Sequence, residues 1–194
     1  MPVRYEWLHT SEPIIGSPIA PVLRFVGPAV MRLASPNGVD IILKQAVELT
    51  MAVEGRMTNI TSIAAAFFEA CEAGRGWEGC RAYCLPNATF AAQSEPLAEI
   101  RTLQAYTEWM KGLLSFMPDG RYEIKSFATD AERNSVCAYG VFSATHTGEG
   151  GPCPPTGKST RTDYVYVMEF DGDKIRHMTK IWNAGWAMRE LGWA

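Results

Sequence analysis

The sequence predicts an α+β fold in which helices pack against a curved, mainly antiparallel β-sheet. Residues 136–147 and 160–170 form runs rich in β-branched and aromatic side chains, which is typical of strands. Asp171-Gly172 follows the second run and precedes a third, and this dipeptide is a strong hairpin signal. Between residues 58 and 117, apolar side chains instead recur at helical spacing. The helices therefore come first and the sheet follows.

Composition places the chain among ordinary globular proteins. With 194 residues, 47% of them hydrophobic and 20% charged, it is long enough for one domain plus an appendage. The net charge of −3, without a basic cluster, argues against a nucleic-acid partner. No apolar run is long enough to cross a membrane, and the first residues do not resemble a signal peptide, so we expect a cytoplasmic protein without a membrane partner. The five cysteines form no C-x-x-C pair, which favours buried thiols over a disulfide framework or a zinc site.

Residues 1–56 are predicted to form an N-terminal arm and an accessory helix. Six of the twelve prolines lie at or before position 36, interleaved with apolar residues, which favours an extended arm lying on a surface. An amphipathic helix is expected over residues 39–53, with Asn37 as its cap and Gly55 as its stop. An alternative left open is that Met57 is the biological start. The main domain is expected over residues 57–194.

Two further helices are predicted before the sheet. The first begins near Thr58 and ends at Gly74, and its apolar stripe consists of Ile60, Ile63, Ala64, Phe67 and Cys71. A turn and a brief strand at 89–91 follow. Ser94 and Pro96 then supply the cap and first-turn proline of a long helix that closes at Pro118-Asp119-Gly120. Its inner stripe contains Ile100, Leu103, Tyr106 or Thr107, Met110, Leu113 and Met117.

Four strands and a short helix complete the predicted domain. The strands are expected at 121–129, 134–147, 160–170 and 174–183, and the helix at 185–191. In the second of these strands, Val136 and Phe142 lie on one face, whereas Cys137, Tyr139 and Val141 lie on the other. Because both faces carry apolar residues, both need cover, and helices can supply only one. A second subunit is the expected cover for the other face, which predicts a homodimer.

Several short motifs resemble the C-terminal half of SnoaL-like proteins. They are His146-Thr147-Gly148-Glu149, the segment 154–158, the hairpin 171–175 and Ile181-Trp182-Asn183. These proteins belong to the nuclear transport factor two-like, or cystatin-like, superfamily, and the resemblance covers roughly residues 57–194. It implies a cystatin-like cone, a homodimer and a deep apolar ligand pocket. It also implies chemistry without a cofactor, of the polyketide cyclase, isomerase or hydrolase kind.

The sequence differs from SnoaL-like proteins at two positions, those of the family's pocket acid and of the histidine that assists it. Alignment on the hairpin places Lys180 at the acid position and Tyr166 at the histidine position. A lysine accepts a proton near neutral pH only if burial depresses its pKa. A lysine and tyrosine pair could instead polarise a carbonyl group or bind a carboxylate. The family's acid is therefore absent, and the chemistry must differ in detail.

The register of the hairpin decides which residues face the pocket, since a one-residue slip inverts every side chain. The register that we favour has a three-residue turn and places Tyr164, Tyr166 and Met168 on the same face as Met178, Lys180 and Trp182, as the family's arrangement implies. A tighter turn would pair Asp163 with Lys180 and make Lys180 structural. The catalytic candidates are Lys180, Tyr166, His146 and Asp163; the candidates for binding substrate are Tyr164, Met168, Met178, Trp182, Trp109 and Phe142; no metal site is expected.

Two functions follow from these residues and from the resemblance. The first is a cofactor-free enzyme of the SnoaL-like type that uses general acid/base chemistry on an apolar carbonyl compound. The second is a dimeric, non-catalytic module that binds a hydrophobic small molecule and has lost the family's acid. A filled core with Lys180 in solvent would exclude the enzyme.

Overall fold

The computed structural model describes the backbone of residues 36–194 and the side chains of residues 42–55 and 59–194. The arm predicted at the N-terminus lies outside the described residues. The chain divides into two compact units that meet between Met51 and Ala52, and everything discussed below belongs to the second unit unless stated. The predicted boundary between residues 56 and 57 stays a prediction.

Helix α2 runs without interruption from Pro36 to Glu72. The prediction that one helix stops at Gly55 and another starts near Thr58 is therefore wrong. A glycine inside a helix weakens it by only about 1 kcal/mol relative to alanine, so it does not end a helix by itself. Gly74 does end this helix as predicted, because its φ of +66° is left-handed. Ile60, Ala64 and Phe68, one turn apart, are buried on the core side.

The middle of the chain differs from the predicted long helix. After α3 (Gly76–Cys80) and strand β1 (Cys84–Ala92), Ser94 and Pro96 start only a 3-10 turn, Glu95–Leu97. Helix α4 (Leu103–Phe116) begins later, where the Thr102 side chain accepts a hydrogen bond from the Ala105 N–H. The helix starts late because Arg101 pairs with β1. The Phe90 N–H donates to Arg101 O at 2.8 Å, and this bond holds Arg101 out of helical geometry.

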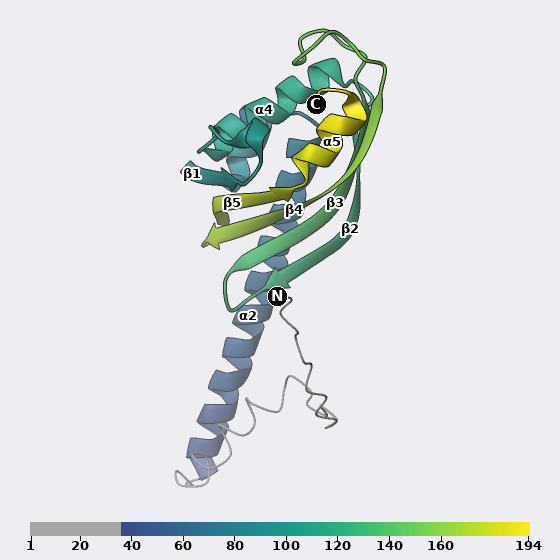
Figure 1. Ribbon diagram of the computed structural model, residues 1–194. Coiled ribbons are helices and arrows are strands. Elements are labelled where there is room, and N and C mark those ends of the chain that lie inside the picture. Colours follow the sequence, from purple (N-terminus) through teal and green to yellow (C-terminus); the bar gives the residue numbers. More distant parts are fainter. Residues whose placement is uncertain (1–35) are drawn as a thin grey trace, which may run out of the picture. The chain divides into compact units, whose positions relative to one another are not determined.

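The four predicted strands and the final helix are confirmed to within one or two residues. They are β2 (Arg121–Asp130), β3 (Ser135–Thr145), β4 (Ser159–Asp171), β5 (Lys174–Trp182) and α5 (Ala184–Leu191). The five-stranded sheet has the order β1-β5-β4-β3-β2, and only the β1–β5 pair is parallel. The sheet bends, and α4 and α5 lie inside the bend (Figure 1). The predicted α+β cone with a curved, mainly antiparallel sheet is confirmed.

The favoured register of the hairpin is confirmed. Tyr166 pairs with Lys180, and Tyr164 pairs with Trp182. The predicted three-residue turn is wrong, because only Gly172 and Asp173 lie between the last pair, Asp171 and Lys174. A register shift next to Glu169 then restores the favoured alignment. Gly172 supplies the positive φ of +59° that the turn requires. A β-bulge therefore fixes which side chains face inward.

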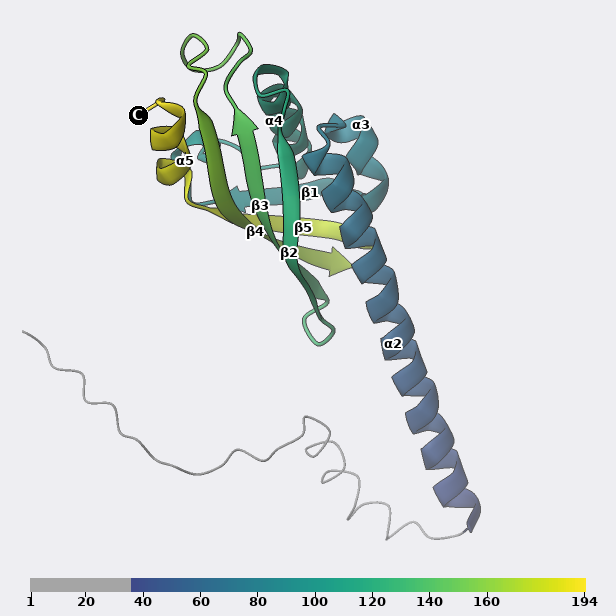
Figure 2. The ribbon, with the colours of Figure 1, turned by 90° about the vertical axis from the view of Figure 1, so that its right-hand side faces the viewer.

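Helices cover the inner face of the sheet, whereas part of the outer face is exposed. On β4, alternate residues from Thr160 to Phe170 are buried on the inner face, beneath the helices. On β3, Val136 and Phe142 are buried, whereas Cys137 and Tyr139 are exposed. The strong twist of the sheet turns β1 and β5 across the direction of β2 and β3 (Figure 2). Among the described residues, no helix is both long and apolar enough to cross a membrane. The cytoplasmic location stays a prediction.

The loop after β3 closes onto the end of α4 through Gly148. Its N–H donates to Phe116 O at 2.9 Å, and a Cβ at this position would lie 2.6 Å from Phe116 Cα and 2.9 Å from Ser115 O. Both neighbours are backbone atoms, which cannot move aside cheaply. We expect Gly148→Ala to lower the free energy of unfolding by about 1–3 kcal/mol, measured by urea denaturation.

Gly112→Ala is the matched control for this substitution. Gly112 lies in α4, and a Cβ there would meet nothing within 4 Å. Alanine should therefore be neutral or stabilise the helix by up to about 1 kcal/mol. Equal stability of the two variants would contradict the tight packing of the loop.

Candidate active site

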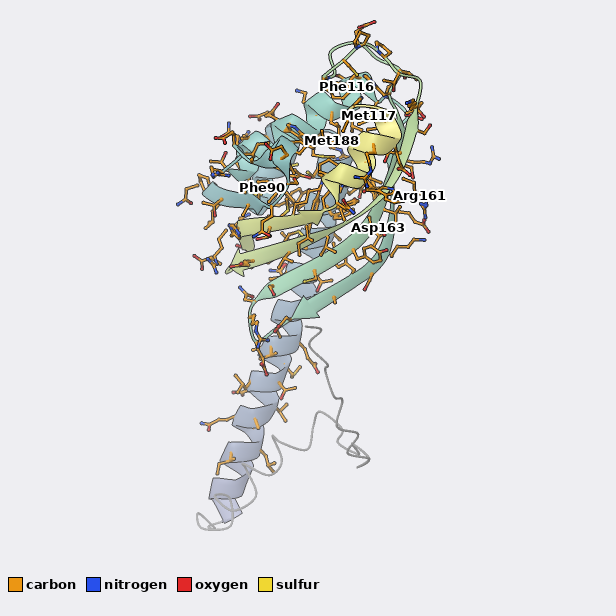
Figure 3. The ribbon with its side chains drawn as sticks, viewed as in Figure 1. Phe90, Phe116, Met117, Arg161, Asp163 and Met188 are labelled. Carbon is orange, nitrogen blue, oxygen red and sulfur yellow. The ribbon has the colours of Figure 1, made fainter. Side chains whose placement is uncertain are left out.

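A largely apolar cavity of about 300 Å³ opens between the inner face of the sheet and helices α4 and α5. Figure 3 shows Phe116 and Met117 at the end of α4, close to Met188 of α5. The polar groups in the wall are few, and they include Glu72, Thr160, Thr162, Tyr164 and Lys180. Apolar walls with a few polar groups are typical of a small-molecule site. The apolar part of the wall includes Trp109, Met110, Leu113, Phe116, Met117, Phe142, Trp182, Met188, Leu191 and Trp193.

A buried chain of hydrogen bonds joins Lys180 to Glu72. Lys180 Nζ donates to Tyr106 Oη at 2.9 Å, and Tyr106 Oη lies 2.5 Å from Tyr166 Oη. The Tyr166 hydroxyl donates to Glu72 Oε1. Because Lys180 can only donate as an ammonium group and a Glu72 carboxylate can only accept, the two hydroxyls between them must donate in the same direction. The chain connects a basic group at the cavity to an acidic group at the end of α2.

Aromatic rings surround the Lys180 ammonium group. The Nζ atom lies 5.0–5.8 Å from the ring centroids of Tyr106, Trp109, Tyr164, Tyr166 and Trp182. Among the side chains that the structure describes, it forms no direct ion pair. Ring faces stabilise a cation, but far less than water does. The pocket tolerates the charged lysine without strongly favouring it.

Burial moves the pKa values of the two ends toward each other. Desolvation raises the pKa of Glu72, although the Lys180 charge and the Tyr166 hydrogen bond oppose this. Desolvation also lowers the pKa of Lys180, and the charge of Glu72 opposes it. Burial raises the pKa values of Tyr106 and Tyr166 well above the usual range, so both hydroxyls keep their protons. Both shifts reduce the free-energy difference between the charged ammonium–carboxylate pair and the neutral amine–acid pair.

Tyr164 presents a buried hydroxyl without a hydrogen-bond partner among the described residues. The Glu72 carboxylate lies within reach of this hydroxyl, and its charge and a weak hydrogen-bonding contact raise the pKa of Tyr164, after the larger effect of burial. The contact nevertheless falls short of the geometry of a full hydrogen bond. The ring packs on Gly140, where a Cβ would lie 3.0 Å from the phenol oxygen. Because Tyr164 lines the cavity, its hydroxyl is placed to donate to a polar group inside the cavity.

His146 is buried behind the cavity wall and does not line it. Its Nδ1 accepts hydrogen bonds from Trp193 Nε1 at 3.0 Å and from the Thr156 N–H at 3.3 Å. The ring packs edge-on against Phe116 and Trp193, both of which line the cavity. His146 therefore positions the wall, and we remove it from the catalytic candidates.

Asp163 lies on the opposite face of the sheet from the cavity. It is exposed and pairs with Val141 on β3, not with Lys180. Figure 3 shows Asp163 and Arg161 projecting from the outer side of β4. The reason is parity: Asp163 is an odd-numbered residue on a strand whose even-numbered residues face inward. The prediction that Asp163 could act at the site is wrong.

The predicted binding residues divide into two groups. Trp109, Phe142, Tyr164 and Trp182 line the cavity. Met168 and Met178 face the same side of the sheet but are fully buried, pair with each other and do not line it. They lie closer to the hairpin, so the prediction that they contact ligand is wrong.

Sequence reasoning missed Glu72 and Tyr106 as functional residues. Ile60, Ala64, Phe68 and Glu72 follow one another at intervals of four residues, so they lie on one buried face of the helix. A glutamate in such a buried stripe was the signal that could have identified it. Tyr106 was expected only as a core residue. Its ring does stack on Phe90 at 4.3 Å, but its hydroxyl also links Lys180 to Tyr166.

The comparisons with known proteins agree with this architecture. AclR, a proposed hydroxylase from Streptomyces galilaeus, is 20% identical, with a TM-score of 0.58 over 71% of this chain and 83% of that chain. A proposed polyketide cyclase from Acidithiobacillus ferrooxidans is 24% identical, with a TM-score of 0.58 over 70% and 96%. A nuclear transport factor two-like protein from Burkholderia xenovorans is 16% identical, with a TM-score of 0.53 over 70% and 97%.

These structures establish the shared fold. No protein with a curated functional description matches the chain. Residues 62–191 match the sequence model of the family described as SnoaL-like polyketide cyclase. This match spans the last turns of α2, the whole sheet and α5. The chain belongs to the SnoaL-like polyketide cyclase family.

Proposed function

We propose that the cavity is the active site of an enzyme that moves protons on an apolar carbonyl compound. The observation that carries this proposal is the hydrogen-bonded chain from Lys180 to Glu72, which places a base and an acid at one apolar cavity. A buried ionic chain of this kind contributes little to stability, because desolvation offsets most of the attraction. Perturbed ionisable groups at a cavity therefore favour a functional role.

The residues divide the work according to their positions. Lys180, in its amine form, takes a proton from the carbon next to the carbonyl group, and the Tyr164 hydroxyl donates to the carbonyl oxygen. Tyr106 and Tyr166 are positioning residues that link Lys180 to Glu72. The apolar walls, with Trp109 and Phe142 among them, select a hydrophobic substrate. The result is an isomerase, cyclase or hydrolase type of reaction for which these residues need no cofactor.

A panel of hydrophobic ketones, epoxides and polyketide-like aromatic compounds tests this proposal. Each compound is assayed for thermal stabilisation and for turnover, since a ligand that binds only the folded state raises the melting temperature. We expect turnover of at least one carbonyl compound, and Lys180→Met should lower kcat by at least about 100-fold. Lys125→Met is the control, because it removes the same charge from an exposed position on β2. Stabilisation without turnover would instead support the non-catalytic binding module.

We also propose that the outer face of the sheet forms a homodimer interface. Tyr139, Val165 and Ile181 lie side by side across three strands, and Ile181 is 61% exposed. A contiguous apolar row on a sheet face is typical of an interface. We expect Val165→Glu to weaken self-association by at least about tenfold, measured by analytical ultracentrifugation. Asp173→Lys, in the exposed hairpin turn, should leave it unchanged; a monomeric wild-type protein would contradict the proposal.

A further inference from the structure

The Lys180 side chain has the surroundings of a nucleophilic amine. It lines the cavity, is buried among aromatic rings, and forms its one described hydrogen bond with Tyr106. A lysine becomes a nucleophile when its surroundings favour the amine over the ammonium group, as a desolvated apolar pocket does. Burial lowers the pKa of Lys180 in this direction.

The tyrosine chain gives the ammonium proton a path away from the cavity. One proton moves along each of three bonds, from Lys180 to Tyr106, from Tyr106 to Tyr166 and from Tyr166 to Glu72. No heavy atom needs to move, because the three bonds already exist. Rotation of the hydroxyl groups then releases the amine lone pair from Tyr106. The amine is formed without a proton being lost to water.

We propose that Lys180 forms an imine with an aldehyde or ketone held in the cavity. The lone pair of Nζ attacks the carbonyl carbon and forms a C–N bond. Both amine hydrogens leave with the carbonyl oxygen as one water molecule, so that R₂C=O and Lys–NH₂ give R₂C=N–Lys and H₂O. The proposal rests on the proposed function, which it deepens by naming the substrate class.

The same surroundings suit the protonated imine. A proton returns from Glu72 through Tyr166 and Tyr106, which gives an iminium ion whose N–H replaces the ammonium donor to Tyr106. The rings around Nζ stabilise this cation as they do the ammonium group. The iminium ion withdraws electrons from the neighbouring C–H bond more strongly than a neutral carbonyl does. Because Nζ is then bonded to the substrate and has no lone pair, the Glu72 carboxylate, which also lines the cavity, takes the proton from this carbon in place of the Lys180 amine. Esters and carboxylic acids do not form imines, so the substrate carbonyl belongs to an aldehyde or a ketone.

Reductive trapping tests this inference on the intact protein. The protein is incubated at pH 7 with 2-naphthaldehyde and sodium cyanoborohydride, and the modified lysine is located by peptide mapping and mass spectrometry. We expect a secondary amine at Lys180 to form at least about ten times faster than at any of the five exposed or half-buried lysines. Those lysines serve as internal controls. 2-Methylnaphthalene, which lacks the carbonyl group, should slow the reaction by competing for the cavity.

Thermal stabilisation by 2-methylnaphthalene separates the two proposals. If this compound stabilises the protein but Lys180 is not labelled preferentially, the imine is overturned and the proposed function stands. If it neither stabilises the protein nor slows labelling, and Lys180 is unlabelled, both fall. Lys180→Arg, which keeps the charge but cannot form an imine, should lose the preferential adduct while keeping the stabilisation.

Discussion

Lys180→Met and Glu72→Gln are each expected to lower the free energy of unfolding by about 3 kcal/mol near pH 7, whereas the double variant should be at least as stable as the wild type. Each single variant leaves one buried group without its counter-charge, which is strongly unfavourable. The double variant removes both desolvation costs and replaces the ammonium group with an apolar side chain. Urea denaturation of the four proteins forms a complete double-mutant cycle.

The pH dependence of the two single variants should have opposite signs. In Lys180→Met, the remaining Glu72 has a pKa raised by burial above the ordinary value of 4.5. The folded protein then binds more protons than the unfolded chain, so stability is greatest below 4.5 and is lost as the pH rises through the folded pKa. In Glu72→Gln, the remaining Lys180 has a pKa lowered by burial from 10.5. Its contribution is full above 10.5 and is lost as the pH falls, so this variant gains stability from pH 7 to pH 10.

The double variant is the reference for both pH curves. When its free energy of unfolding is subtracted at each pH, the contributions of the other titrating groups cancel. Parallel pH curves for the two single variants would contradict the burial of both charges. Additive single-variant effects would contradict the coupling through the tyrosines. Either result would remove the base and acid from the proposed site.

The sheet could be predicted from the sequence because its signals are local. Asp171-Gly172 between β-rich runs fixes a hairpin, and alternation along residues 160–170 fixes which side chains face inward. The start of α4 could not be predicted, since it depends on pairing between Arg101 and β1, residues that are apart in the sequence. The predicted helix end at Gly55 was wrong for a similar reason. A glycine ends a helix where the backbone turns left-handed, and the sequence alone does not show the φ angle.

The site could be predicted only on the strand side. Lys180 and Tyr166 follow from the hairpin register, and Phe142 follows from the alternation along its strand. Glu72 and Tyr106 complete the hydrogen-bonded chain, but they come from α2 and α4, whose rotation about their axes the apolar pattern defines only coarsely. For His146 the error was the opposite one, a residue predicted to be catalytic that is structural. This histidine lies in a family motif, but it accepts a hydrogen bond from Trp193 and so holds that side chain in the cavity wall.

Tyr164→Phe and Tyr166→Phe are expected to separate activity from stability, although both remove one hydroxyl from the same face of β4. The Tyr164 hydroxyl has no protein partner among the described residues, so its loss should leave stability unchanged or raise it by up to about 1 kcal/mol. It should nevertheless lower kcat by about 100-fold, because it is the donor to the carbonyl oxygen in the proposed reaction. Tyr166→Phe removes the donor to the buried Glu72 carboxylate and should cost about 2 kcal/mol or more.

The two variants are compared by urea denaturation and by steady-state kinetics on the first carbonyl compound that the panel identifies. Phenylalanine keeps the ring in both, so the packing of Tyr164 on Gly140 and the stacking with Phe68 at 6.0 Å are preserved. A Tyr164→Phe variant with full activity would show that its hydroxyl does not contact the substrate. A large loss of stability in that variant would show that the hydroxyl already has a partner inside the protein. Retained stability together with lost activity is the result that distinguishes a catalytic hydroxyl from a structural one, because a structural hydroxyl contributes to the folded state whether or not substrate is bound.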